Sequence, residues 1–210
     1  MPIPSQASWL VRKILSVRDY LLSFADGIDV LSDASFSVKN VYSVLRGDVQ
    51  KVEWRKLTCN NPAPPKCIFI VWLDALNKMV TCDRLIKIGI ACEPICCLCE
   101  KASENVCHLF FECEYSASVW SCVLQWFGVN RRPRNWEEEM QFIVTQFKSN
   151  SVKHQMYRMM VSVVVYLLWR ERNQRKFKLV KSNSETIVKE AQYMIYSRSL
   201  NVSRLACCLP

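Results

Sequence analysis

Residues 96–113 read CCLCEKASENVCHLFFEC, and this stretch decides how the centre of the chain folds. Four of its side chains have the spacing of a metal site: Cys96, Cys99, His108 and Cys113. Three thiolates and one imidazole are a donor set that Zn²⁺ prefers, and a C-x-x-C pair lets one tight turn present two sulfurs to the same ion. Because protein donors fill all four positions of a tetrahedral site, none is left for a reactive water. The stretch therefore predicts one structural zinc ion.

The same stretch leaves the choice of ligands open. Cys107 stands next to His108, and Cys92 and Cys97 are further thiols that compete for the ion. Spacing alone excludes none of them, nor does it exclude reduced, buried cysteines around a hydrogen-bonded histidine. A nucleophile and base formed by Cys107 and His108 is disfavoured, because neighbours in sequence rarely align for that proton transfer.

The composition of the chain is typical of a folded protein in a reducing compartment. Half of its 210 residues are apolar and only 4 are glycine, which argues against disorder and against glycine-rich phosphate loops. Residues 1–15 hold no apolar run of signal-peptide length, so the 12 cysteines indicate metal binding and packing in the nucleus or cytoplasm. The longest apolar run, Met159–Trp169, is shorter than the roughly 20 residues that cross a bilayer, and no membrane partner is expected. The cysteines expected to pack as small hydrophobic side chains are Cys59, Cys67, Cys82 and Cys122.

Helical periodicity dominates the remaining sequence. The predicted fold is mainly α, a multi-helix domain with a small zinc knuckle between helices. Residues with capping character mark the helix starts: Ser37, Thr81, Asn135 and Ser182. Prolines between positions 62 and 65 stop any helix there, and apolar stripes follow over 68–76, 119–127, 152–178 and 187–195. The valines between positions 161 and 165 also suit a strand, because β-branched side chains favour extended backbone.

The net charge of +9 is concentrated in the C-terminal third of the chain. Residues 131–210 carry 15 basic and 6 acidic side chains, whereas residues 92–130 carry one lysine and five glutamates. Phosphates would be repelled near the cysteines, because three thiolates on one zinc ion add negative charge to those glutamates. Phe110 and Phe111 lie between two ligands and are expected to form a small core there rather than to stack on bases.

Contacts to nucleic acid are expected at a basic run in the C-terminal third. Its candidate residues are Arg170, Arg172, Arg175, Lys176 and Lys178. On a helix these cations cover much of the circumference, and those three or four positions apart share a face. The arginines at positions 131, 132 and 134 are expected to extend this basic surface. The alternative is a solvated helix end whose cations are favoured by the helix dipole.

Several short motifs surround the cysteines in series. They are Phe36-Ser37-Val38-Lys39, Tyr42, Trp54, Pro65-Lys66, Trp72-Leu73, Asp83-Arg84-Leu85, Cys96-x-x-Cys99, His108-Leu109-Phe110-Phe111-x-Cys113 and Trp120. This series resembles the plant reverse transcriptase zinc-binding domain, which follows the polymerase in LINE-type (non-LTR) retrotransposon proteins. The resemblance divides the chain into a flanking segment at 1–34, the zinc-binding domain at 35–121 and a basic helical region at 122–210.

The resemblance implies a ligand set and a class of function. The ligands that it implies are Cys96, Cys99, His108 and Cys113, which favours His108 over Cys107. It also implies a module of an element that handles RNA and DNA. Polymerase activity is not expected, because the chain contains no Tyr-x-Asp-Asp sequence and its helical pattern leaves no room for a polymerase palm.

Two functions are therefore compatible with the sequence. We expect a non-enzymatic zinc-binding module that binds single-stranded RNA or DNA. The alternative is a structural or protein-interaction remnant, in which zinc only stabilises the fold and the acidic knuckle binds a basic protein.

Overall fold

The structure is a computed structural model, and it describes residues 12, 47, 52, 54–147 and 149–201. Internal contacts divide the chain into two units, Met1–Lys51 and Val52–Pro210, and the fold described below is that of the second. The helix start predicted at Ser37, and nearly all of the flanking segment at 1–34, lie outside the described residues.

The described part of the second unit is built from helices. Its α-helices are α4 (Arg55–Thr58), α5 (Pro65–Ala75), α6 (Cys82–Lys87), α7 (Glu114–Trp126), α8 (Trp136–Gln146), α9 (Val152–Lys178) and α10 (Ser184–Leu200). A π-helix, η1 (His108–Glu112), stands between α6 and α7. The described residues contain no strand, only an isolated bridge between Ile95 and Ser103. The predicted mainly α fold is confirmed.

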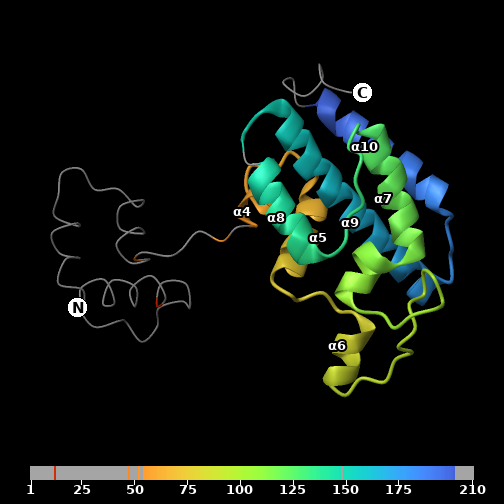
Figure 1. The fold of residues 1–210 in the computed structure, drawn as a ribbon. Coiled ribbons are helices and arrows are strands. Elements are labelled where there is room, and N and C mark those ends of the chain that lie inside the picture. Colours follow the sequence, from red (N-terminus) through yellow and green to blue (C-terminus); the bar gives the residue numbers. More distant parts are fainter. Residues whose placement is uncertain (1–11, 13–46, 48–51, 53, 148, 202–210) are drawn as a thin grey trace. The chain divides into compact units, whose positions relative to one another are not determined.

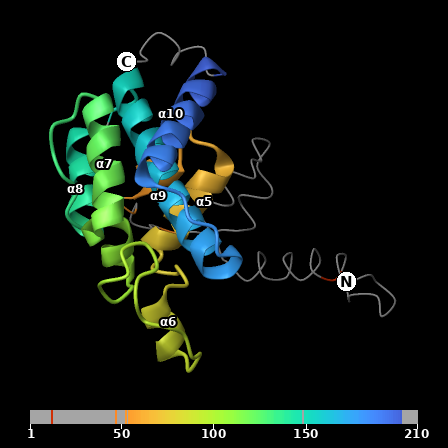
Figure 2. The ribbon, with the colours of Figure 1, turned by 90° about the vertical axis from the view of Figure 1, so that its right-hand side faces the viewer.

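Helix α9 is the centre of this unit. Helices α5 and α10 pack along it, and α4, α7 and η1 also contact it (Figures 1 and 2). Residues 156–165 of α9 are all buried, including the valines that also suited a strand. A helix satisfies the backbone groups of this run internally, whereas a strand without neighbours would leave them unpaired in the core. Neither α9 nor any other described helix is long and apolar enough to span a bilayer.

Asn61 fixes the turn between α4 and α5 onto α9. Its amide nitrogen lies within hydrogen-bonding distance of the carbonyl oxygens of Leu57 (2.7 Å) and Arg158 (3.2 Å). The same nitrogen lies 2.8 Å from Ser162 Oγ. Helix α5 then begins at Pro65, where a missing backbone N–H is tolerated because the first turn has no partner for it.

Helices α8 and α10 show one capping residue that was predicted correctly and one that was not. Asn135 caps α8, since its side chain accepts a hydrogen bond from the Glu138 N–H (2.8 Å), as predicted. Helix α10 is capped by Asn183, which accepts from the Thr186 N–H (2.8 Å), and not by the predicted Ser182. The backbone of Ser182 is instead bound to side chains of α7 and α9, which places it before the helix.

One of the predicted domain boundaries falls within α7. This helix runs without interruption through position 121, where that boundary lies, and the predicted boundaries stay predictions.

Of the cysteines expected to pack in the core, Cys67 and Cys82 are buried. Cys59 and Cys122 are exposed, so for these two the expectation was wrong: Cys59 follows the end of α4, and Cys122 lies on the outer face of α7.

Candidate metal centre

The C-x-x-C turn is closed by backbone hydrogen bonds. The Glu100 N–H donates to the carbonyl oxygen of Cys96 (2.8 Å), and the Cys96 N–H donates to that of Ala102 (2.8 Å). Glu100 has a φ of 58°, in the left-handed region, which allows the chain to turn back on itself after Cys99. These contacts hold the two cysteines of the turn on the same side of the knuckle.

The π-helix η1 brings the second pair of donors together. His108 and Cys113 are five residues apart, and the Cys113 N–H donates to the carbonyl oxygen of His108 (2.8 Å). In an α-helix, residues five apart point in directions about 140° apart around the axis, because each residue turns by about 100°. The wider π turn reduces that angle and allows both side chains to face one ion. Asn105 starts this turn, since its side chain accepts from the His108 N–H (2.8 Å).

Helix α7 supports the carbonyl groups that the π turn leaves free. Trp120 Nε1 donates to the carbonyl oxygen of Phe110 (2.7 Å), and Ser116 Oγ donates to that of Leu109 (2.6 Å). The ring of Phe111 stacks on Trp120, with ring centroids 5.9 Å apart. Phe110 and Phe111 are 0% and 3% exposed, so they form the small core that was predicted for them.

The four predicted ligands form one cluster: Cys96, Cys99, His108 and Cys113. Their donor atoms all lie within 4.8 Å of one another, and Cys99 Sγ is 3.2 Å from His108 Nε2. A hydrogen bond between the thiols of Cys96 and Cys113 raises the pKa of the first and lowers the pKa of the second. Donor atoms so close together are what a single ion with metal–ligand bonds of about 2.0–2.3 Å requires.

The chemistry of this cluster fits one structural zinc ion. Cys96 and Cys113 are fully buried, and His108 is 8% exposed, so water has little access. Three sulfurs and one imidazole nitrogen complete a tetrahedron without a water ligand, the pattern of sites that stabilise a fold rather than catalyse a reaction. Binding there would join the C-x-x-C turn to η1.

The competing thiols lie in other surroundings. Cys107 is half-buried and outside the cluster, and burial raises the pKa of its thiol. The Cys97 thiol faces the carbonyl oxygen of Arg172 (3.6 Å), and the Cys92 thiol faces that of Cys82 (3.5 Å). The geometry thus selects His108 over its neighbour, the choice that spacing alone left open.

A buried ion pair joins the knuckle to α9. Arg172 and Glu104 are 2% and 0% exposed, and their side chains meet at 2.6 Å. Glu104 also accepts from the Cys82 N–H (3.0 Å) at the start of α6. Burial by itself would raise the pKa of Glu104, but the hydrogen bonds from Arg172 hold that pKa below its ordinary value. The acidic knuckle and the basic run, separate in sequence, neutralise each other here.

Arg175 is a second link between the knuckle and α9. Its Nη1 donates to the carbonyl oxygens of Cys97 (3.2 Å) and Leu98 (3.0 Å), within the C-x-x-C turn itself. Its Nε donates to Glu171 (2.7 Å), one helical turn earlier and fully buried. Glu171 in turn accepts from the Ser182 N–H (2.8 Å). One arginine therefore holds the metal loop, the end of α9 and the segment that leads into α10.

The remaining cations of the predicted nucleic-acid run have different surroundings. Arg170 forms an ion pair with Glu190 of α10, and the ammonium group of Lys176 contacts the Cys82 sulfur. Lys178 is exposed at the last residue of α9. Of the arginines expected to extend the surface, Arg131 pairs with the buried Glu139 (2.6 Å).

Sequence reasoning missed the buried acids that these arginines meet. Glu171 carries a local signal, because a glutamate four residues before an arginine on a helix is a stabilising pair. Glu104 carries none, since its partner Arg172 is 68 residues away in sequence and only the folded chain brings them together.

Comparison with known proteins finds a similar family for one region of the chain, the region that contains the metal centre. No curated protein and no solved structure matches the chain. A family described as zinc-binding in reverse transcriptase matches residues 36–120. All four clustered donors lie within those residues. Residues 36–120 are therefore similar to the zinc-binding region of reverse transcriptases, and the cysteine and histidine side chains of that region meet here in a site that fits one structural zinc ion.

Proposed function

We propose that the chain is a retroelement-derived, zinc-stabilised module that binds single-stranded RNA or DNA and has no polymerase or other catalytic activity. The similarity of residues 36–120 to a reverse transcriptase region supports a link to an element that handles both nucleic acids. The motifs around the cysteines support an origin in a plant element of the LINE type. The proposed role of zinc is to shape the module, because protein donors complete the site.

The observation that carries the nucleic-acid proposal is the exposed end of α9. Phe177 is 73% exposed and is followed directly by the exposed Lys178. Lys181 lies three residues further on, with a side chain 63% exposed. An exposed aromatic ring among cations is the arrangement on which single-stranded nucleic acids stack, because every base offers a π face and every linkage a phosphate.

The metal centre helps to hold this surface in place through Arg175. Arg175 binds two carbonyl groups of the C-x-x-C turn, and it lies two residues before Phe177. Loss of zinc would free that turn and remove the fixed point for the end of α9. The proposal therefore expects weaker nucleic-acid binding by the metal-free protein.

The proposal rests on Lys178 rather than on the other four cations of the predicted run. Arg170, Arg172, Arg175 and Lys176 all make contacts within the protein. Lys181 also has a partner, Glu100, but both side chains are more than 60% exposed. Such surface pairs contribute little and yield readily to a phosphate.

The experiment is a titration of labelled single-stranded RNA and DNA with the zinc-loaded protein at several salt concentrations. Affinity should fall between about 50 and 200 mM salt, with a slope of about −0.7 for each phosphate neutralised on a single strand. Replacing Lys178 by Gln should reduce that slope by about 0.7. Phe177→Ala should weaken binding by about 1–3 kcal/mol through lost stacking without changing the slope.

A matched control comes from the opposite end of the same helix. Lys153 is exposed in the first turn of α9, so Lys153→Gln removes one charge without touching the proposed surface. Its affinity and salt slope should equal those of the unaltered protein. Equal effects of Lys153→Gln and Lys178→Gln would show only a general effect of net charge and would contradict the proposal.

A second function is favoured by one observation. Four of the five predicted cations already have partners inside the protein, which is expected if the module is structural. In that case the protein binds one zinc ion but no nucleic acid, and exposed glutamates of the knuckle such as Glu93 and Glu112 bind a basic protein. Salt-sensitive binding of a lysine-rich peptide that is lost in Glu112→Gln, with no binding of RNA or DNA, would favour this function over the first.

A further inference from the structure

A second feature of the molecule, away from the metal ligands, has the composition of an anion site. It is a pocket of about 310 Å³ where the end of α4 faces the segment before α9. Its lining residues are Arg55, Lys56, Cys59, Asn60, Ser149, Asn150 and Arg158. Three of these carry a positive charge, and no described residue of the lining carries a negative one.

Arg158 is the residue that distinguishes this pocket from an ordinary basic surface. It is 1% exposed, and burial lowers its pKa. Its Nη1 donates to two neutral acceptors, the carbonyl oxygens of Phe147 (2.7 Å) and Ser149 (2.9 Å). Its Nε is buried and has no hydrogen-bond partner within the described part of the chain. No carboxylate of the described residues forms an ion pair with it, unlike the buried Arg172.

A buried guanidinium without a counter-charge is expensive, because arginine keeps its proton and cannot relieve the cost by becoming neutral. The fold holds Arg158 in place. Asn61 binds the backbone carbonyl of Arg158, and Ser162 Oγ donates to the same carbonyl (3.0 Å). These contacts fix the backbone of Arg158 in the pocket wall, and the carbonyl oxygens of Phe147 and Ser149 hold its guanidinium before any ligand arrives.

The rim of the pocket adds donors suited to oxygen atoms. Arg55 is exposed on α4, one turn before Cys59. Asn60 has a φ of 58°, which turns the chain at the pocket edge, and Asn150 faces it from the segment before α9. Guanidinium groups and amides together are the usual partners of phosphate oxygens, since they offer several N–H donors in a fixed plane.

We propose that this pocket binds a phosphate group, with Arg158 as the buried counter-charge and Arg55 as a second cation at the rim. The group is either free phosphate or the phosphate of a nucleic acid strand. The proposal goes beyond the function proposed above, because it concerns α4 and the start of α9 and not the zinc knuckle or the end of α9.

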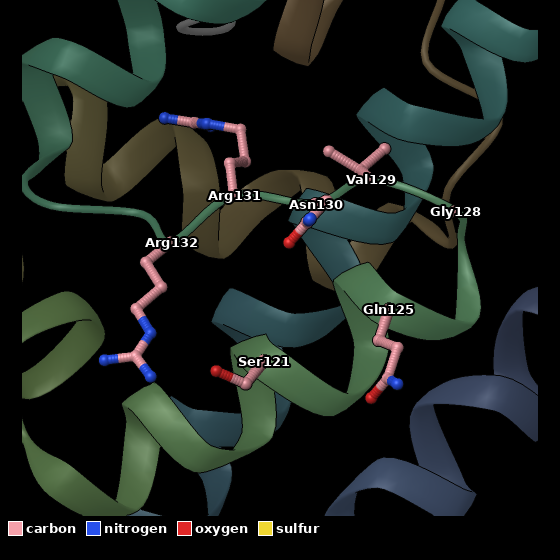
Figure 3. A pocket seen from close by; sticks show the side chains of 7 residues that line it. All are labelled: Ser121, Gln125, Gly128, Val129, Asn130, Arg131 and Arg132. Atoms are coloured by element: carbon pink, nitrogen blue, oxygen red, sulfur yellow. The ribbon is translucent and has the colours of Figure 1, made fainter.

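A larger pocket supplies the contrast and a control. It has a volume of about 560 Å³ and is lined in part by Arg131 and Arg132 (Figure 3). Figure 3 shows the side chains of these two arginines pointing in different directions. Arg131 is neutralised by Glu139, to which its Nη1 donates at 2.6 Å. This pocket therefore lacks the uncompensated buried charge that the first one has.

The test is a titration of the full, zinc-loaded chain with inorganic phosphate at constant ionic strength, followed by the backbone amide signals of Asn60 and Asn150. Saturable shifts at these residues are expected, with none from chloride at the same ionic strength. Arg55→Gln should weaken binding several-fold, while Arg132→Gln, in the other pocket, should leave it unchanged. Equal affinities of the unaltered protein and Arg55→Gln, or shifts that never saturate, would overturn the proposal.

Arg158 itself is tested by a variant that keeps the charge. Arg158→Lys should retain a positive group but lose the planar set of donors, and weaker phosphate binding by a variant with a native amide spectrum is expected. If that variant does not fold, the Arg55→Gln result decides. A dinucleotide that binds more tightly than inorganic phosphate identifies the nucleic acid backbone as the source, and the reverse order identifies free phosphate. Phe177→Ala should leave phosphate binding intact, which separates this test from that of the nucleic-acid surface at the end of α9.

Discussion

Glu104 shows how much a single buried charge depends on its partner. Its carboxylate is fully buried and meets the guanidinium of Arg172 at 2.6 Å. Removing one member of such a pair leaves the other charged and unpaired in the interior, which costs about 3–5 kcal/mol. Replacing both members by apolar side chains of similar volume is often neutral, because no charge then has to be desolvated.

We therefore predict that Glu104→Gln lowers the free energy of unfolding by about 3–5 kcal/mol. The double variant with Leu at both positions should recover most of that loss. Urea denaturation of the zinc-loaded proteins measures both. Glu114→Gln removes an exposed partner of Lys101 and serves as the control, with little change expected. A double variant as unstable as the single one would mean that the pair is needed for its shape and not only for its charge balance.

Asp74 predicts a pH dependence. It is 3% exposed, neither carboxylate oxygen has a hydrogen-bond partner among the described residues, and burial raises its pKa from 3.8 to about 8. Between these two values the folded protein holds a proton that the unfolded chain releases, so stability falls as pH rises through that window and levels off above about 8.

The measurement compares the unaltered protein with Asp74→Asn. Their difference in unfolding free energy should change by about 1.4 kcal/mol per pH unit between roughly pH 5 and 7, with the variant gaining relative stability as pH rises. Parallel curves for the two proteins over that range would show that Asp74 is ionised in the folded state.

At the scale of the elements, the π-helix η1 is what makes the metal centre possible. Two side chains of α7 hold its carbonyl groups, and His108 and Cys113 face the C-x-x-C turn because the helix is wider than an α-helix. A backbone turn of this kind is rare and persists when its surroundings stabilise it. Helix α7 provides that support, and a bound zinc ion would add to it.

We predict that the protein binds about one zinc ion per chain and that chelation opens the knuckle and η1 first. Helix α8 and the buried residues 156–165 of α9 do not include the ligands, so their amides should stay protected from hydrogen exchange after zinc is removed. Elemental analysis and hydrogen-exchange mass spectrometry measure the two effects.

Two cysteines, one inside the cluster and one outside it, provide the matched variants for this prediction. Cys107→Ser should keep its zinc, because Cys107 lies outside the cluster, while Cys96→Ser should lose it. Zinc retained by Cys96→Ser, or lost from Cys107→Ser, would assign the ligands differently.

At the scale of the whole molecule, the parts predicted correctly from sequence are those encoded by nearby residues. The donors Cys96 to Cys113 have a spacing that only a few site types share, and Asn135 caps α8 because its partner lies three residues away. Helix α9 could be expected from its period, although its valines left a strand open. Mainly α architecture with a knuckle between helices follows from these local patterns.

The parts that could not be predicted depend on residues brought together by folding. Nothing near Glu104 in sequence indicates a buried partner, and nothing near Arg175 indicates that it binds carbonyl groups of the C-x-x-C turn. Ser182 is a similar case. Its backbone N–H donates to Glu171 of α9, and Asn183 caps the next helix in its place. A row of cations in sequence could be recognised, but not which of them point inward.

The contacts across the molecule also predict how a shorter piece would behave. A fragment of residues 36–120 contains all four zinc donors but ends inside α7 and lacks α9. Without Arg172 and Arg175, Glu104 has no counter-charge and the turn carbonyls have no donor. We predict that residues 36–201 hold zinc about 10–100-fold more tightly than residues 36–120, the range in which outer contacts tune metal affinity. Competition with a chelator measures this ratio, and equal affinities would show that α9 does not support the site.

Because residues of α9 bind the knuckle, a chain that contains the zinc motif does not necessarily form the zinc site. A chain can keep every cysteine and histidine of the pattern and still fail to form the site if it has lost two arginines that lie more than sixty residues downstream of the knuckle residues they bind. Related chains should therefore be compared at these distant positions as well as at the ligands. Chains that retain the motif but carry neutral residues in place of Arg172 and Arg175 are expected not to bind zinc.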